Sequence, residues 1–295
     1  MNNDEKQMFD FAYSLTRSAG LQLKQGRKNS VLRVREKTSP MDLVTEYDLV
    51  IERFLIEMIK EKYPDHEILA EESQTGSDPK GTVSCIVLGS NERIKAHRQG
   101  YRWVIDPIDG TVNYYRFGKD YTVSIALYKD ETPVFGLVYD VAADVMFRAG
   151  QAEGATLNGY NLPDLPDRCR ELNKAVVVMS LRTMREFYAI GTDVLGLLSR
   201  VQAHRYLGCA SLELCKVAIG DYDLFISATV YEWDVAAARI FLEQCGGFFL
   251  CPKKDNPGTT VDKLLVAAFR SPVLWRETLQ YLPPDLRAQF AQIDL

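Results

Sequence analysis

Residues 103–114 read WVIDPIDGTVNY, and this stretch decides how the rest of the chain is interpreted. The apolar run Trp103–Ile105 predicts a buried strand that stops at Pro107, because proline has no amide proton to donate to a sheet. Asp106 and Asp109 then place two carboxylates three positions apart across a tight turn. Two carboxylates this close repel each other unless a cation lies between them. Crowded hard oxygen ligands of this kind favour Mg²⁺.

The same residues also have a purely structural interpretation. Aspartate followed by glycine is a common turn pair, and aspartate followed by proline commonly ends a strand. Gly110 frees the backbone at this point, and Thr111 adds a hydroxyl group. On these residues alone a structural turn and a metal site both stay open, and the other acidic residues of the chain have to decide between them.

Composition bounds the class of protein. A chain of 295 residues with 46% hydrophobic and 25% charged residues can bury a large core, as one large domain or as two closely packed ones. The net charge of −5 argues against a dedicated nucleic-acid surface. No apolar run is long enough to cross a membrane. The first residues lack a basic segment followed by an apolar one, so we expect no signal peptide and a cytoplasmic location.

The cysteines and histidines do not suggest a site of their own. The six cysteines form no Cys-x-x-Cys pair, and we expect them to be small buried side chains in a reducing compartment. The three histidines are widely scattered in the sequence, which argues against a histidine-based zinc site. His66 is expected to be a loop residue.

The first quarter of the chain predicts two helices with a basic segment between them. Apolar residues recur at helical spacing over residues 4–25, and Gly26 is expected to end that helix. Residues 27–40 are basic and irregular. Their simplest interpretation is a solvated charged face, and the alternative is a mobile loop that carries Lys37 over an anionic substrate.

A second helix is predicted to begin after Asp48 and to close at Lys62. Thr45 and Asp48 have the spacing of a capping box, which by itself would account for Asp48. A short strand, 68–70, then ends in the acidic pair Glu71–Glu72. Adjacent acids at a strand end point in opposite directions, so one of them can face a site.

The remaining chain separates into an antiparallel part and an alternating part. Residues 74–100 are interpreted as an excursion with a strand-like run over 83–88. Short strands joined by short turns then predict an antiparallel meander over 122–128, 133–139 and 144–149. From residue 173 strands and helices alternate. The expected elements are strands 175–180, 224–227, 247–250 and 264–269, and helices 182–200, 212–220 and 234–245. We therefore predict an N-terminal α+β half over 1–172 and a C-terminal α/β half over 173–295.

Acidic residues now stand at four points where a strand or turn ends: Asp48, Glu71, the pair Asp106 and Asp109, and Asp234. Asp234 begins a helix, where capping would also explain it. The fragments that contain these acids are DLVTEYD at 42–48, EES at 71–73, WVIDPIDGTVN at 103–113 and WDVAA at 233–237. Together, and in this order, they resemble the inositol monophosphatase family of Mg²⁺-dependent, lithium-sensitive phosphatases, over nearly the whole chain.

This resemblance implies a layered αβαβα sugar-phosphatase fold, with an antiparallel-sheet half, an α/β half and the site between them. It implies a phosphoric monoester hydrolase that uses metal-activated water on a small phosphorylated metabolite, a polyol or a sugar. It also implies two or three Mg²⁺ ions and inhibition by Li⁺ and Ca²⁺. It also implies a homodimer.

The resemblance further implies a role for individual residues. The metal ligands would be Glu71, Asp106, the backbone carbonyl of Ile108, Asp109 and Asp234. Thr111 and Asp48 would be hydrogen-bonded to one another and, with Glu71, would orient the attacking water. The substrate-binding residues would be Lys37, Ile108, Asp109, Gly110, Thr111, Gly208, Cys209, Ala210 and Asp234.

One position departs from the pattern of the inositol-specific members, which have a glutamate seven residues before the last metal-binding aspartate. Here that position is Ser227, so the substrate class stays open. The alternatives are 3′(2′),5′-bisphosphate nucleotidase activity, fructose-1,6-bisphosphatase activity, or a non-catalytic regulatory binding protein on the same fold. The intact set of acidic residues favours an enzyme, because a binding protein would not need all of them.

Overall fold

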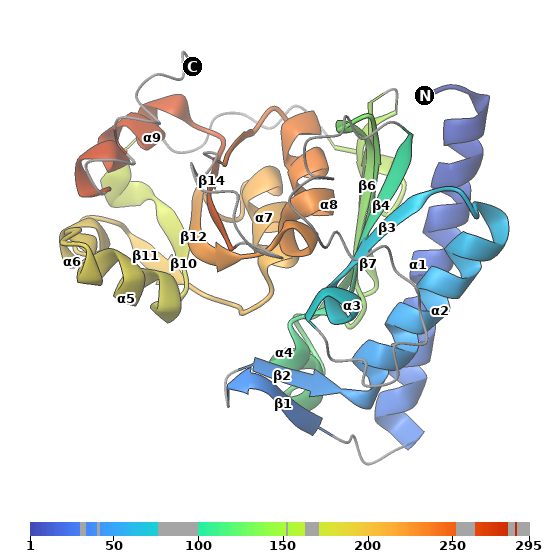
Figure 1. Cartoon of the computed structure of the whole chain (residues 1–295). Coiled ribbons are helices and arrows are strands. Elements are labelled where there is room, and N and C mark those ends of the chain that lie inside the picture. Colours follow the sequence, from blue (N-terminus) through green and yellow to red (C-terminus); the bar gives the residue numbers. More distant parts are fainter. Residues whose placement is uncertain are drawn as a thin grey trace, which may run out of the picture.

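The fold is a stack of alternating helical and sheet layers (Figure 1). The computed structural model describes residues 1–29, 34–39, 42–75, 100–151, 153–162, 171–251, 263–282 and 287. Helices α1 (Asn3–Asn29) and α2 (Glu46–Lys62) cover the outer face of a first sheet, and α7 (Ala210–Ile219) and α8 (Glu232–Gln244) lie between this sheet and a second one. Helices on the far face of the second sheet complete the predicted αβαβα arrangement.

Within the described residues, the first sheet has seven strands in the order β3-β4-β5-β6-β7-β8-β9. Only β3 and β4 pair in parallel within it, so the predicted antiparallel meander is confirmed. The strands are β3 (Glu67–Ala70), β4 (Tyr101–Asp109), β5 (Thr122–Lys129), β6 (Thr132–Asp140), β7 (Val145–Gly150), β8 (Gly154–Leu157) and β9 (Tyr160–Asn161). The predicted run 83–88 lies outside the described residues.

The second sheet has five strands in the order β11-β10-β12-β14-β13. Strand β10 pairs in parallel with β11 and β12, whereas β14 is antiparallel to both of its neighbours. The strands are β10 (Val176–Met179), β11 (Ala203–Arg205), β12 (Leu224–Val230), β13 (Phe248–Leu250) and β14 (Leu264–Phe269). The proposed boundary at residues 172 and 173 falls within the short 3₁₀ turn Leu172–Lys174 and stays a prediction.

The single helix predicted over 182–200 is wrong. The structure has two helices there, α5 (Leu181–Ala189) and α6 (Val194–Leu198), followed by β11, which was not predicted. Gly191 separates the helices because its φ of 79° is left-handed. Helix α9 (Pro272–Thr278) and a second 3₁₀ turn (Leu279–Tyr281) follow β14.

The basic segment 27–40 is also more regular than predicted. Strand β1 (Val34–Ser39) pairs antiparallel with β2 (Asp42–Thr45), which leads directly into α2. This hairpin lies beside the short helix α4 (Thr111–Arg116) (Figure 1). The first turn after β3 is likewise a short helix, α3 (Glu71–Thr75), rather than an open strand end.

Gly26 does not end the first helix, which continues to Asn29. A Cβ atom added at Gly26 would lie 2.3 Å from the ring of Tyr47. The absence of a side chain at this position therefore permits close packing of Tyr47 against α1, which a pattern of helix stop signals cannot reveal.

Pro107 does not stop the central strand, which runs to Asp109. The pairing of β4 with β5 shifts register between Asp106 and Asp109. A proline is tolerated in a strand at such an irregularity, because no ladder hydrogen bond is lost there. The bulge also changes the direction of the strand where its two carboxylates lie.

Each layer boundary is filled by its own apolar core. Leu55, Trp103 and Phe135 lie in the core between the first helical layer and the first sheet. A second core, which includes Phe147 and Phe241, joins the first sheet to α8 and the second sheet. A third lies beneath the outer helices of the second sheet. No helix in the described residues is long and apolar enough to cross a membrane.

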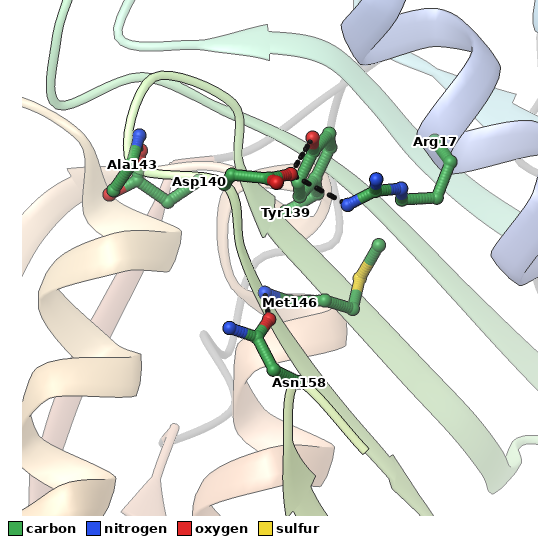
Figure 2. Close-up of polar contacts among 7 residues, drawn as sticks. Arg17, Tyr139, Asp140, Ala143, Met146 and Asn158 are labelled. Carbon is green, nitrogen blue, oxygen red and sulfur yellow. Dashed lines mark hydrogen bonds and ion pairs between the residues drawn. The ribbon is translucent and has the colours of Figure 1, made fainter.

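Polar contacts fasten α1 to the end of the first sheet (Figure 2). Arg17 Nη1 lies 2.6 Å from Asp144 Oδ1, which also accepts a 2.5 Å hydrogen bond from the Tyr139 hydroxyl. The Asn158 side chain accepts a hydrogen bond from the backbone N–H of Met146 in the neighbouring strand (2.7 Å). These contacts fix the turns that follow β6 and β8.

The described cysteines are all free thiols. Cys209 and Cys215 are buried as predicted, but Cys251 is exposed, so the expectation of buried cysteines is wrong for that residue. Cys85 and Cys169 lie outside the described residues.

Candidate active site

The bulged end of β4 holds the two central carboxylates by backbone and side-chain contacts. Asp106 Oδ1 accepts a hydrogen bond from the N–H of Ile108 at 3.0 Å. Asp109 Oδ2 accepts hydrogen bonds from the backbone N–H of Ser211 (2.7 Å) and from its hydroxyl (2.6 Å). Ser211 belongs to α7, so this contact ties the first sheet to the helical layer between the sheets. Sequence reasoning missed Ser211.

Two further carboxylates lie close enough to Asp106 to interact with it electrostatically. Burial raises the pKa of Asp106 well above its ordinary value, and the charges of Glu71, Asp109 and Asp234 raise it further. Across the described residues, no group of three or more His, Cys, Asp or Glu side chains is already in position to hold a metal ion. The structure thus gathers the predicted acids without assembling their ligand geometry. Mutually repelling carboxylates gathered around the buried Asp106 fit the hard oxygen donors that Mg²⁺ requires.

Glu71 is held in place by a buried glutamate that the sequence analysis did not single out. Glu52 accepts hydrogen bonds from the backbone N–H groups of Glu72 (2.6 Å) and Ser73 (2.8 Å) and from the Ser73 hydroxyl (2.5 Å). Burial raises the pKa of Glu52 to about 7. Its position four residues after Asp48, on the same face of α2, was the available signal.

Asp234 lies in the first turn of α8. Its Oδ2 accepts a hydrogen bond from the N–H of Tyr231 at 2.7 Å, as expected of a residue that caps its own helix. The neighbouring Glu232 pairs with the buried guanidinium of Arg102 at 2.6 Å. Arg102 belongs to β4, so the same strand that carries Asp106 also fixes the start of α8.

Thr111 and Asp48 are in contact. The Thr111 hydroxyl lies 2.9 Å from Asp48 Oδ1 and 3.2 Å from the carbonyl oxygen of Ile108. The other oxygen of Asp48 accepts hydrogen bonds from the backbone N–H (2.7 Å) and the hydroxyl (2.5 Å) of Thr45. One carboxylate oxygen of Asp48 therefore makes the capping contacts, and the other accepts the hydrogen bond from Thr111.

Gly110 precedes α4 in a left-handed conformation, with φ of 86°. A Cβ atom there would lie 3.1 Å from the carbonyl oxygen of Asp120 and 3.2 Å from Cys209 Cβ, so the site requires glycine for both conformation and space. The Asn113 side chain donates hydrogen bonds to the carbonyls of Asp120 and Leu207, each at 2.8 Å. These contacts connect α4 to the segment that contains Gly208.

Glu213 in α7 holds the start of the segment Gly208–Ala210 in place. Glu213 accepts hydrogen bonds from the N–H groups of Leu207 and Gly208. Burial raises its pKa to about 8. Burial likewise raises the pKa of the Cys209 thiol well above its ordinary value, and the thiol donates a hydrogen bond to the Asp109 carbonyl. Cys209 is therefore a packed neutral thiol rather than a nucleophile.

A pocket of about 250 Å³ opens beside these residues. Among the predicted residues, its lining includes Asp109, Gly208, Cys209, Ala210 and Asp234. Ser227 also lines it, together with Arg182 and Tyr206, which sequence reasoning missed because neither belongs to a motif. Lys37 lies in β1, and its side chain is outside the described part of the chain.

The site has a cluster of carboxylate oxygens beside a short helix that begins after a glycine. This arrangement suits the removal of a phosphate group from an alcohol. In this layered fold that combination defines the phosphoric monoester hydrolases. A family model described as the inositol monophosphatase family matches residues 4–284. The chain belongs to this family.

Individual relatives agree with this assignment. The inositol-1-monophosphatase of Bacillus subtilis (strain 168) is 32% identical over 241 residues, covering 81% of this chain and 83% of the relative. The crystal structure of SaIMPase-II bound to 2′AMP is 26% identical with a TM-score of 0.73, covering 97% of this chain and 99% of that one. An IMPase/NADP phosphatase crystallised with Mg²⁺ and phosphate shares the fold, with a TM-score of 0.75 at 21% identity over 96% of this chain and 97% of that one.

Proposed function

We propose that the chain is a Mg²⁺-dependent phosphomonoesterase that hydrolyses a small phosphorylated polyol or sugar. The observation that carries the proposal is the convergence of Glu71, Asp106, Asp109 and Asp234 on one buried position. These carboxylates, with the carbonyl of Ile108, would hold two or three Mg²⁺ ions. When bound, the ions lower the pKa of a water and neutralise negative charge on the leaving alkoxide.

The protein's own groups prepare the reaction around this position. The Thr111 hydroxyl donates a hydrogen bond to Asp48, so its oxygen keeps lone pairs that would accept a hydrogen bond from the attacking water. Glu71, which Glu52 holds in place through the adjoining backbone, would assist in orienting this water. The amide groups of Gly110 and Thr111 at the start of α4 would receive the phosphate. No protein nucleophile is required, which agrees with the buried, neutral state of Cys209.

The family membership supports further parts of the proposal. We propose inhibition by Li⁺ and Ca²⁺, a homodimeric assembly and a cytoplasmic location. The alternative of a nucleotide substrate has support from the SaIMPase-II relative, which was crystallised with 2′AMP. Ser227, in place of the glutamate of inositol-specific members, is consistent with either class.

The test is phosphate release by the purified protein. The panel contains inositol 1-phosphate, fructose 1,6-bisphosphate, histidinol phosphate and adenosine 3′,5′-bisphosphate, each with and without Mg²⁺ and Li⁺. We expect turnover of at least one substrate that requires Mg²⁺ and falls with Li⁺. Absence of phosphate release from every substrate with Mg²⁺ present would contradict the proposal and favour a regulatory role.

A further inference from the structure

The pocket beside Asp109 and Asp234 is lined by both apolar and polar side chains. The apolar ones include Phe225, Ile226 and Val230, and the polar ones include Ser227. Each hydroxyl group of a polyol that is buried there needs a hydrogen-bond partner, because an unpaired hydroxyl weakens binding.

Ser227 is not available as such a hydrogen-bond partner, because its hydroxyl is already used within the protein. It accepts a hydrogen bond from the N–H of Thr229 at 3.2 Å and lies 3.5 Å from the hydroxyl groups of Thr183 and Thr229. Thr183 is committed as well, since its hydroxyl accepts a hydrogen bond from the N–H of Ala228. This part of the pocket is therefore a satisfied network rather than a binding edge.

Arg182 is the cation in the lining of this pocket. It is exposed in the first turn of α5, and within the described residues no carboxylate lies within ion-pair distance of it. An unpaired guanidinium presents a planar set of donors that matches a carboxylate or a phosphate group.

Tyr206 lines the same pocket as Arg182. Its side chain is 55% exposed, and a Cβ atom at Gly208 would lie 3.7 Å from its hydroxyl oxygen and 3.8 Å from its ring. Burial and nearby carboxylates raise the pKa of Tyr206, whereas the Arg182 charge lowers it, so the guanidinium lies within electrostatic range of the phenol. An exposed aromatic ring beside a cation offers a stacking surface for a planar group.

We propose that Arg182 and Tyr206 form a subsite for the leaving alcohol, and that the preferred substrates carry a second anionic group and a ring that stacks on Tyr206. This inference rests on the proposed phosphatase activity and favours the nucleotide alternative named above over a phosphorylated polyol. The second anionic group is a phosphate or a carboxylate, because the guanidinium binds both in the same way.

Matched substrate pairs test the subsite. The first pair is adenosine 2′,5′-bisphosphate and adenosine 2′-monophosphate, which differ by a second phosphate. The second pair is 2-phosphoglycerate and glycerol 2-phosphate, which differ by a carboxylate. Inositol 1-phosphate is the reference, because its ring carries no second anionic group. Wild type is expected to have a KM for adenosine 2′,5′-bisphosphate about tenfold below that for adenosine 2′-monophosphate, and lower than that for inositol 1-phosphate. Comparison of the phosphate pair with the carboxylate pair identifies which anion the subsite prefers.

Two variants separate the charge from the ring. Arg182→Gln is expected to raise KM about tenfold for the substrates with a second anionic group, with kcat and the KM of glycerol 2-phosphate within twofold of wild type. Tyr206→Leu is expected to raise KM for both adenosine substrates and to leave the glycerol pair unchanged. Arg185→Gln, an exposed arginine of the same helix outside the pocket lining, is the control and should match wild type.

The outcomes distinguish this inference from the proposed function. Equal losses in Arg182→Gln for substrates with and without a second anionic group would overturn the subsite while leaving the phosphatase activity established. A wild-type preference for inositol 1-phosphate would do the same. No phosphate release from any substrate would overturn both.

Discussion

Replacement of Glu52 by glutamine tests whether a buried carboxylate on α2 is kept at a raised pKa. Glu52 is 4% exposed, and burial raises its pKa from 4.5 to about 7 despite the hydrogen bonds it accepts from Ser73 and Glu72. Glutamine has the same shape and retains one oxygen for these donors, but it cannot ionise.

The sign of the effect follows from proton binding. Because the folded state holds the Glu52 proton more tightly than the unfolded state, the free energy of unfolding falls as the pH rises from 4.5 to about 7. This rise in the pKa lowers the free energy of unfolding by about 3 kcal/mol over the whole pH range. About 2 kcal/mol of this loss occurs between pH 5 and pH 8. Glu52→Gln lacks this loss, so it should gain stability over wild type by that amount as the pH rises.

The assay is chemical denaturation at pH 5 and at pH 8, with EDTA present so that bound metal does not contribute. Glu57→Gln is the matched control, because Glu57 is exposed on the same helix. For this control the difference from wild type should be the same at both pH values. A difference between wild type and Glu52→Gln that is also independent of pH would refute the reasoning, since the pKa of Glu52 would then be ordinary.

Three further results are expected. Asp109→Asn should leave the circular dichroism spectrum unchanged and lower kcat more than a hundredfold, and unchanged turnover would remove Asp109 from the proposed metal ligands. Ser211→Ala removes a hydroxyl that donates a hydrogen bond to Asp109. It should lower the free energy of unfolding, measured by denaturation, by about 1–2 kcal/mol and raise the Mg²⁺ concentration needed for half-maximal activity. An unchanged Mg²⁺ concentration for half-maximal activity would show that Ser211 does not position Asp109. Burial lowers the pKa of His66, and its Nδ1 accepts a hydrogen bond from Trp103. Wild type should therefore lose stability relative to His66→Gln as the pH falls below about 6.5. Parallel curves of unfolding free energy against pH for the two proteins would contradict a neutral His66.

The sequence predicted the carboxylates of the site better than the residues that hold them. Asp106, Asp109 and Asp234 lie next to glycine, proline or helix-start patterns, and such patterns place them at the ends of strands and helices. Their contact partners have no comparable pattern. Ser211 and Glu213 lie within a helix where nothing local distinguishes them, and their contacts reach back to Asp109 and to residues 207–208.

The errors in the predicted elements have a common physical origin. Gly26 and Pro107 match local stop signals, but packing against Tyr47 and a β-bulge decide their roles. Conversely, Gly191 separates two helices although no local pattern marks it as a stop. Local propensity alone cannot separate these cases, because tertiary contacts determine which glycine ends a helix and which permits close packing.

The place of α8 between the two sheets has a consequence for biosynthesis. The seven-stranded sheet is complete in the chain well before α8 is made, and one of its faces carries apolar side chains such as Val104 and Phe147 that pack in the same core as Phe241 of α8. Until α8 leaves the ribosome, the nascent chain exposes this face, a condition that favours capture by chaperones. The docking of α8 that covers the face also brings Asp234 to the other carboxylates. The burial of this apolar face and the assembly of the four candidate metal ligands are therefore one event in folding.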